Sequence, residues 1–499
     1  MIAAAWRVPP AAAARVDSSA QPFASWSFVG VASLSLTEAA ELVRRRRVSP
    51  VELTRACLER IEKVNPGLNA FITVTAESAL ASARVAEGEI GRGGWKGPLH
   101  GIPIALKDLL DTAGVRTTAG SALFKERIPQ QDAQVVRRLK EAGAVLLGKL
   151  NMHEFAFGGS SAFSAFGPVR NPWNPAYSSG GSSGGSAAAV SAQLCYAALG
   201  SDTGGSIREP AACCGIVGLK PTFGRVSTSG AIPLSWSLDH IGPMTRTVND
   251  AALVLQVIAG YDAQDPASIN EPVPDYTAEI GGSTSALRLG VPRDFFYEGL
   301  HPDIEAAMQA ALGVLAGLTR TQRDVPPLAS DASYASIMEP YVAILSAEAY
   351  EFHREYVASS PELYQSPTLK RIRRGADVTL SAYLKSRRRL DQVRHAGMSF
   401  FADVDLLVTP TMPVPPFALN ELGDPDAARS LELRMLHHTR PLNFLGLPSL
   451  SVPCGFTAAG LPLGLQICGP PGSEATVLRL AQAFERATPW HQSNPVSAG

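Results

Sequence analysis

The sequence contains few cysteines, and it has no apolar stretch long enough to cross a membrane. Six cysteines occur among 499 residues, none of them in a C-x-x-C pair. Most lie among apolar or small residues, so we expect reduced, buried thiols in a cytoplasmic protein. No run of about 18 apolar residues exists, which predicts no membrane span. The N-terminal segment is interrupted by Arg7, Pro9, Pro10 and Arg15, which is not typical of a secretory signal.

The chain also lacks an excess of charge of either sign. The formal net charge is −1 and the pI is about 6.8. Such a balance creates no global field that favours nucleic acid or a membrane surface, so neither is predicted as a partner. The densest basic cluster, Arg44 to Arg47, is interpreted as the C-terminal turn of a helix, where cations suit the helix dipole.

Several motifs of metal and cofactor chemistry are missing. The sequence contains no H-E-x-x-H, no set of Cys and His at metal-ligand spacing, and no S-x-x-K. These absences argue against zincin and β-lactamase chemistry. There is no G-x-x-x-x-G-K-[ST], and no G-x-G-x-x-G follows a strand. No metal and no cofactor are therefore predicted.

The chain has the composition of a large globular protein, with 45% hydrophobic and 18% charged residues. A first helical pattern begins near Thr37, which is interpreted as a helix N-cap. A second helix is predicted to begin at the capping box S-P-V-E at 49–52 and to end at N-P-G at 65–67. Residues 300 to 400 are also predicted to be largely helical. Short apolar runs that alternate with helices are expected as buried strands at 102–106, 144–148, 195–199, 287–291, 405–409 and 449–453.

This alternation predicts an α/β fold. We expect residues 31–490 to form one domain, after a poorly ordered or loosely docked leader at 1–30 and before a tail at 491–499.

Residues 178–186 read S-S-G-G-S-S-G-G-S and allow three interpretations: a flexible tether, a phosphate cradle or part of a catalytic site. A tether is disfavoured because the helix-forming segment A-A-A-V-S-A follows directly. A G-x-S-x-G pattern is centred on both Ser182 and Ser183. A nucleophile elbow requires a strand immediately before it, whereas a proline-rich turn is expected here, so an α/β-hydrolase site is disfavoured.

Two further stretches contain residues suited to chemistry. A predicted strand leads into Asp202-Thr203-Gly204-Gly205-Ser206, a tight turn whose consecutive N–H groups could bind an oxyanion. Lys107 ends another predicted strand. Burial would lower the pKa of its amine and could make it a neutral base near pH 7.

Taken together, these stretches resemble the amidase signature family of serine hydrolases. The resemblance covers most of residues 35 to 485 and follows the family order of motifs. The matching segments are G-I-P-I-A-L-K-D (101–108), S-S-G-G-S-S-G-G-S-A-A-A (178–189), G-S-D-T-G-G-S-I-R-E-P-A (200–211) and G-L-K-P-T-F-G-R (218–225). Weaker matches follow at D-L-L-V-T-P-T (405–411), G-L-P-S-L-S-V-P-C-G (446–455) and G-L-P-L-G-L-Q-I-C-G-P (460–470).

The resemblance implies a three-layer α/β/α fold around a large twisted mixed sheet. It also implies a catalytic triad of Lys107, Ser182 and Ser206, in which Ser206 is the nucleophile and Ser182 follows a cis peptide bond. The N–H groups of Thr203, Gly204, Gly205 and Ser206 would form the oxyanion hole. Supporting roles are expected for Ser183, Asp202 and Arg208.

The function implied by the resemblance is hydrolysis of an amide bond, with carbamates and esters as further possibilities and without a cofactor. On this interpretation the partner is a small-molecule amide or carbamate, and the protein is a monomer or homodimer. Two alternatives stay open: the A subunit of a tRNA-dependent glutamine amidotransferase, and a non-catalytic binding protein on the same scaffold. The amidotransferase alternative is weakened because an R-Y-G tripeptide that we associate with that subfamily is absent.

The substrate pocket is predicted less directly. An apolar pocket is suggested by aromatic residues near the motifs, which could equally belong to the core. The segments expected to shape it are 120–165, 230–240 and 330–445. The aromatic residues are Phe155, Phe157, Phe163, Phe166 and Trp236.

Overall fold

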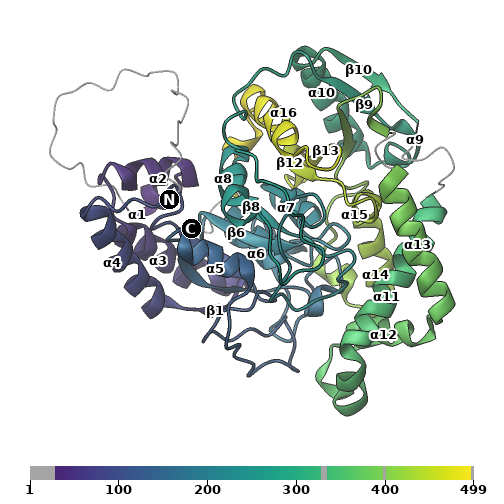
Figure 1. Cartoon of the computed structure of the whole chain (residues 1–499), viewed down its shortest axis with the longest axis horizontal. Helices are drawn as coiled ribbons and strands as arrows, with labels where there is room; N and C mark the ends of the chain where they lie inside the picture. The colour runs from purple at the N-terminus through teal and green to yellow at the C-terminus, as the bar shows by residue number, and fades with distance from the viewer. Residues whose placement is uncertain (1–27, 327–333, 397–399, 496–499) are drawn as a thin grey trace.

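The computed structural model describes residues 28–326, 334–396 and 400–495, and its centre is an eleven-stranded mixed sheet (Figure 1). The strand order across the sheet is β1-β3-β2-β6-β8-β7-β12-β13-β11-β9-β10. The strands are β1 (Phe71–Val74), β2 (Pro103–Lys107), β3 (Val145–Leu150), β6 (Ala197–Ser201), β7 (Val217–Lys220), β8 (Ile241–Thr245), β9 (Arg288–Val291), β10 (Thr321–Asp324), β11 (Leu406–Pro410), β12 (Ser449–Phe456) and β13 (Pro462–Cys468).

The sheet combines parallel and antiparallel pairs. Strand β2 is parallel to both β3 and β6, and β9 is parallel to both β10 and β11, while β12 runs antiparallel to β7 and β13. Every residue of β2, β6, β7, β8, β11 and β13 is buried. Strands buried on both faces have continuous apolar sequences, which explains why all six predicted strands are confirmed to within a few residues.

Helices flank the sheet (Figure 1). Helices α6 and α7 pack together and against the central strands, while α8, α10 and α16 form a second packed group against strands that include β8 and β12. The predicted three-layer α/β/α arrangement is therefore confirmed. The helices are α1 (Phe28–Ala32), α2 (Leu36–Arg44), α3 (Pro50–Leu68), α4 (Ala76–Gly91), α5 (Gln134–Glu141), α6 (Gly184–Ser191), α7 (Arg208–Cys214), α8 (Val248–Ile258), α9 (Arg293–Phe296), α10 (Pro302–Leu318), α11 (Tyr334–Ser359), α12 (Ser366–Arg373), α13 (Leu380–Ala396), α14 (Pro425–Met435), α15 (Arg440–Phe444) and α16 (Glu474–Ala487).

Helices α11 to α14, drawn in green, lie beside the sheet at the right of Figure 1. They come from the segment predicted to be largely helical and from the region that follows it. Two of them, α11 and α13, pack against each other, and α11 also contacts the short helix α15. This arrangement places Tyr341, Thr439 and Arg440 against the turn that follows β6.

Two helix boundaries differ from the prediction. The N-cap of α2 is Ser35, whose hydroxyl accepts a hydrogen bond from the Glu38 N–H, whereas Thr37 lies inside the helix and donates its hydroxyl to Asp250. Helix α3 does not end at 65–67 but continues through Pro66 to a left-handed C-cap at Asn69. Thr37 was mistaken for the N-cap because its hydrogen bond to Asp250, which is distant in sequence, cannot be recognised from local sequence.

The predicted leader at 1–30 lies outside the described residues up to residue 27, and so do positions 496–499 of the predicted tail. All six cysteines are buried and carry free thiols, as expected. Among the helices that the structure describes, none has the length and apolar character required to cross a membrane.

Candidate active site

Lys107 lies at the carboxyl end of β2 and is fully buried. Its amine forms hydrogen bonds with three hydroxyls, at 2.7 Å from Ser182 Oγ and 2.8 Å from both Ser183 Oγ and Ser201 Oγ. The sequence predicted that Lys107 and Ser182 act together and that Ser183 supports them. The structure brings these three side chains together and adds Ser201, which precedes the predicted oxyanion turn.

The surroundings of Lys107 favour its neutral form. Burial lowers the pKa of its amine to about 7, although the nearby carboxylates of Asp202 and Asp239 act in the opposite direction. Its three hydrogen-bond partners are uncharged hydroxyls, which stabilise an ammonium less than a carboxylate would. A neutral Lys107 can accept a proton, so the environment of this amine suits a base near pH 7.

The Gly/Ser segment 178–186 is a fixed part of the interior and not a tether. All nine residues are buried, and helix α6 begins inside the segment at Gly184. The peptide bond between Gly181 and Ser182 is cis, the geometry expected at this position. The Gly181 N–H donates to Glu209 Oε2 at 2.7 Å, and the carbonyl oxygen of Ser182 accepts a hydrogen bond from the His153 N–H at 3.1 Å.

A strand does precede this segment, contrary to the sequence analysis. Strand β5 (Asn174–Ser178) pairs with β4 (Arg170–Asn171) in a separate two-stranded ribbon. The two prolines, Pro172 and Pro175, led us to predict a turn. The ribbon is not part of the main sheet, so it differs from the strand that supports a nucleophile elbow. The other serines of the segment bond elsewhere: Ser178 Oγ donates to the Ser160 carbonyl, and Ser186 Oγ donates to the Leu199 carbonyl.

The turn after β6 is held by Asp202 and Arg208, both fully buried. The Asp202 carboxylate accepts hydrogen bonds from the Gly205 N–H at 2.8 Å and from Arg208 Nε at 3.0 Å. Burial alone would raise the pKa of Asp202, but the charge and hydrogen bonds of Arg208 outweigh that effect and keep its pKa below the usual range. Arg208 also donates to Gln466 at 2.7 Å and to Asn443 at 2.6 Å, which ties the turn to β13 and α15.

The oxyanion donors predicted from the sequence are not equivalent in the structure. The Gly205 N–H is already bonded to Asp202. The N–H groups of Thr203, Gly204 and Ser206 donate to no acceptor within the described ranges. Gly205 has a φ of +131°, and a Cβ there would collide with Thr439, so only glycine suits this position. The donors that remain available are therefore those of Thr203, Gly204 and Ser206.

Sequence reasoning missed several residues that form the wall beside this turn. Tyr341 on α11 donates its hydroxyl to the Thr203 carbonyl at 3.3 Å, and Thr439 donates to the Gly204 carbonyl at 2.6 Å. Asp239 accepts the Thr203 hydroxyl at 2.6 Å. These residues lie in no Gly- or Ser-rich motif, so local sequence carries no signal for them. Ser201, in contrast, lies within the quoted segment G-S-D-T-G-G-S.

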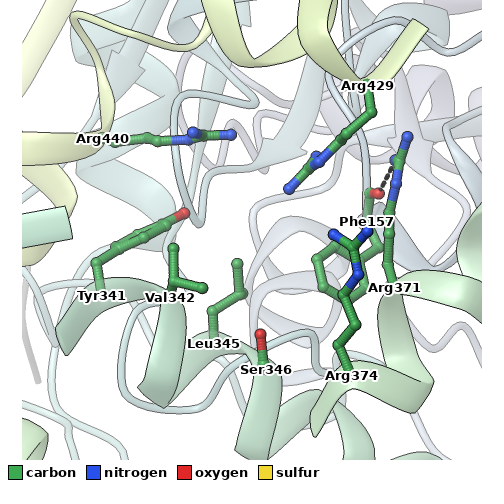
Figure 2. A pocket seen from close by; sticks show the side chains of 9 residues that line it. All are labelled: Phe157, Tyr341, Val342, Leu345, Ser346, Arg371, Arg374, Arg429 and Arg440. Atoms are coloured by element: carbon green, nitrogen blue, oxygen red, sulfur yellow. Dashed lines mark hydrogen bonds between the residues drawn. The ribbon is translucent and has the colours of Figure 1, made fainter. Parts of the chain in front are cut away.

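A small cavity of about 60 Å³ adjoins the turn and is strongly basic (Figure 2). Of the five aromatic residues expected to form an apolar pocket, Phe157 is the one that lines this cavity. Phe155 is buried, and Trp236 is 45% exposed. The lining residues come from the segments predicted to shape the pocket, and they include arginines that the sequence analysis did not single out. The cavity contains four arginines: Arg371, Arg374, Arg429 and Arg440.

In the described ranges, no group of three or more His, Cys, Asp or Glu residues is arranged to hold a metal ion. The Lys107 amine and the hydroxyls of Ser182 and Ser183 meet at Ser201, where the turn that leads to Ser206 begins. A family model described as Amidase matches residues 52–478, which is most of the chain. The chain belongs to the amidase signature family.

Three comparisons within this family are informative. The chain is 42% identical to the A subunit of glutamyl-tRNA(Gln) amidotransferase from Geobacter sp. (strain M21), over 92% of this chain and 98% of that relative. The solved structure of the A subunit of glutamyl-tRNA(Gln) amidotransferase from Thermotoga maritima is 35% identical, with a TM-score of 0.75 over 92% of this chain and 96% of that one. A structure described as revealing the evolutionary origins of an s-triazine catabolic enzyme, in a vestigial protein complex, is 32% identical, with a TM-score of 0.84 over 91% of this chain and 98% of that one.

These relatives overturn the predicted partners. We expected a small-molecule amide or carbamate, no nucleic acid, and a monomer or homodimer. That prediction is wrong, because amidase signature relatives aligned over nearly their whole length are named as one subunit of an enzyme of glutamyl-tRNA(Gln). The near-neutral charge balance misled us, since net charge describes the average field of a chain and not the surface through which a protein meets its partners.

Proposed function

We propose that the chain is the amide-hydrolysing subunit of an amidotransferase assembly, related to the A subunit of glutamyl-tRNA(Gln) amidotransferase, and that it releases ammonia from glutamine. The observation that carries the proposal is the alignment with that subunit over 98% of the relative's length. The fully buried Lys107, bonded to Ser182 beside the Ser206 turn, supports a working hydrolytic site rather than a non-catalytic scaffold.

In the proposed mechanism, neutral Lys107 accepts a proton from Ser182, which accepts one from Ser206 as Ser206 Oγ attacks the amide carbon. The N–H groups of Thr203, Gly204 and Ser206 bind the oxyanion that develops on the carbonyl oxygen. When the C–N bond breaks, the relay returns the proton to the leaving nitrogen, which departs as ammonia. Water then attacks the acyl group on Ser206 and releases the acid.

The roles of Asp202 and Arg208 are to hold the turn. Their buried ion pair fixes the Gly205 N–H and links the turn to Asn443 and Gln466. Rigid donors are required because an oxyanion hole stabilises the transition state only when its donors are already oriented. Ser183 and Ser201 position the Lys107 amine through their hydroxyls.

Ammonia release from L-glutamine by the purified full chain tests the proposal, with Ser206→Ala as the inactive variant and Ser186→Ala as its matched control. Ser186 is a buried serine whose hydroxyl bonds to the Leu199 carbonyl, and it is not among the three serines that bond to Lys107. We expect Ser206→Ala to lower kcat by several orders of magnitude and Ser186→Ala to retain activity. The assembly is tested by combining the chain with the other components of a related amidotransferase, in place of their own amide-hydrolysing protein, and measuring glutaminyl-tRNA(Gln). No glutamine turnover in either setting would contradict the proposal.

A second candidate is an amidase that acts without an amidotransferase assembly, with carbamates or esters as further substrates. It is favoured by the TM-scores, which are 0.84 with the structure described as revealing the origins of an s-triazine catabolic enzyme and 0.75 with the amidotransferase structure. The missing R-Y-G tripeptide points the same way. Hydrolysis of aliphatic amides, aryl amides, carbamates or esters by a chain that leaves glutamine intact would select this candidate.

A further inference from the structure

The arginine pocket, defined by Tyr341, Arg371, Arg374, Arg429 and Arg440, has features of a binding site for an anion. Figure 2 shows Arg429 and Arg440 extending toward each other across the cavity, from α14 and α15, with Val342 and Leu345 of α11 below them. No acidic side chain lines the cavity among the residues that the structure describes. A pocket with several cations and no lining carboxylate attracts a negatively charged group.

One carboxylate lies behind the wall and neutralises part of the charge. Glu432 is fully buried, and it lies 2.8 Å from Arg371 and 3.7 Å from Arg429. It also accepts the hydroxyl of Ser160 at 2.6 Å. Because one carboxylate faces two guanidinium groups, the pocket retains an excess of positive charge. Glu432 is also occupied by these partners and is not available to an ammonium group inside the cavity.

Arg440 is the residue least satisfied by its surroundings. It is 7% exposed, and its guanidinium forms no ion pair and no hydrogen bond with any residue in the described ranges. The guanidinium lies 6.0 Å from the Tyr341 ring centre, so an aromatic face covers part of it. Leaving a buried charged donor unsatisfied is costly. The absence of an acceptor for the guanidinium is explained if a ligand in the cavity supplies one.

The pocket adjoins the reaction turn through two shared residues. A Cβ placed on Gly204 would collide with the Tyr341 hydroxyl and lie 3.4 Å from Arg440 Cγ. Tyr341 also donates to the Thr203 carbonyl. Tyr341 and Arg440 both line the pocket, so these two side chains contact the pocket on one side and the turn that ends at Ser206 on the other. A ligand that binds Arg440 is therefore connected to the turn of the proposed oxyanion donors through one side chain.

We propose that the arginine pocket binds a carboxylate on the acyl part of the amide substrate, and that Arg440 determines this specificity. The inference rests on the proposed amide hydrolysis at Ser206. It extends it by assigning a substrate class: monoamides of short dicarboxylic acids. Since the described lining offers no carboxylate for an ammonium group, an α-amino group on the substrate adds nothing to recognition in this pocket.

The test compares two amides of equal chain length with the full-length protein. Glutaramate, the monoamide of glutaric acid, carries a terminal carboxylate, and pentanamide carries a methyl group instead. We expect kcat/KM for glutaramate to exceed that for pentanamide by about 10- to 100-fold, the range expected for hydrogen bonds to a charged group. The substitution Arg440→Met should reduce this preference by a similar factor, mainly through KM, and Arg440→Lys should recover part of it. The exposed Arg434 of α14 provides the control Arg434→Met, which should keep the preference.

Binding measurements decide the inference even where turnover is weak. Calorimetry with Ser206→Ala should show that glutaramate binds about 10-fold or more weakly once Arg440→Met is added. Equal turnover of both amides by the wild type, or equal losses for both amides in Arg440→Met, would overturn the inference and assign Arg440 a structural role. Failure to use glutamine or to support glutaminyl-tRNA(Gln) synthesis, with the glutaramate preference intact, would instead count against the proposed function alone.

Discussion

Lys107 Nζ lies 2.7 Å from Ser182 Oγ, in a site that is closed to solvent on the lysine side. The lysine can act as a base only when its amine is neutral. Burial lowers the pKa of that amine to about 7, so the neutral fraction grows as the pH rises through 7.

We therefore expect kcat/KM for a primary amide to increase with pH and to level off above about pH 7 to 8. Below that range the protonated amine cannot accept a proton from Ser182, and the rate should fall about tenfold for each pH unit. The measurement is a pH–rate profile of the full chain, with stability checked at each pH. A profile that is flat between about pH 6 and about pH 9 would be inconsistent with Lys107 as the base.

Two buried lysines lie on adjacent strands, and we expect substitution of one to affect catalysis and substitution of the other to affect stability. Lys149 on β3 is buried like Lys107, but its amine bonds to the Leu110 carbonyl and the Thr117 hydroxyl and lies 3.5 Å from Asp108. Lys107→Met should abolish amide hydrolysis while the protein stays folded. Lys149→Met leaves the buried Asp108 carboxylate without its cation, so it should lower the free energy of unfolding by about 3 to 5 kcal/mol. Activity assays and thermal unfolding on both variants check this. A Lys107→Met variant that stays active would refute the assignment.

The sequence predicted the elements near these residues well. Strand β2 and its terminal Lys107, the turn from Asp202 to Ser206, and the buried Ser182 are all encoded by continuous segments with a local signature. Apolar runs identify buried strands because the main sheet is covered on both faces. Short glycine-rich turns identify places where backbone N–H groups are left free.

The remainder of the site depends on tertiary contacts and could not be predicted in this way. Arg440, Tyr341 and Glu432 come from helices that are far from the Gly/Ser motifs in sequence but close to them in space. The sequences around them are typical of any amphipathic helix, so they do not indicate a functional site. The apolar pocket stays a prediction, since Phe157 lines the arginine cavity and aromatic residues near a motif fill the core as readily as they line a cavity.

Gly204 offers a steric test of the wall beside the turn. A Cβ at this position would collide with the Tyr341 hydroxyl, so Gly204→Ala must displace either Tyr341 or the turn. We expect it to reduce kcat by at least about 100-fold, because oxyanion donors are effective only within a narrow geometry. The control is Gly313→Ala on α10, where a Cβ meets no atom within 4 Å. It should keep activity and stabilise the helix by up to about 1 kcal/mol. Full activity of Gly204→Ala would argue against a rigid turn.

The buried pair of Arg208 and Asp202 should matter far more than an exposed pair of the same type. Arg208→Met leaves the Asp202 carboxylate buried without its partner, and we expect a loss of about 3 to 5 kcal/mol in the free energy of unfolding. Arg288 and Asp405 form a comparable pair, but their side chains are 39% and 33% exposed. Arg288→Met should therefore cost about 1 kcal/mol or less. Chemical denaturation of both variants gives the comparison, and equal losses would contradict the role given to burial.

The central claim is that the reaction passes through an acyl group on Ser206. The most direct measurement is acid quenching of the full chain during turnover of glutamine or glutaramate, followed by intact mass spectrometry and peptide mapping. We predict a mass increase equal to the mass of the substrate minus that of ammonia, located on the peptide that contains Ser206 and absent in Ser206→Ala. An acyl group located on Ser182 or another residue, or continued turnover by Ser206→Ala, would contradict the account.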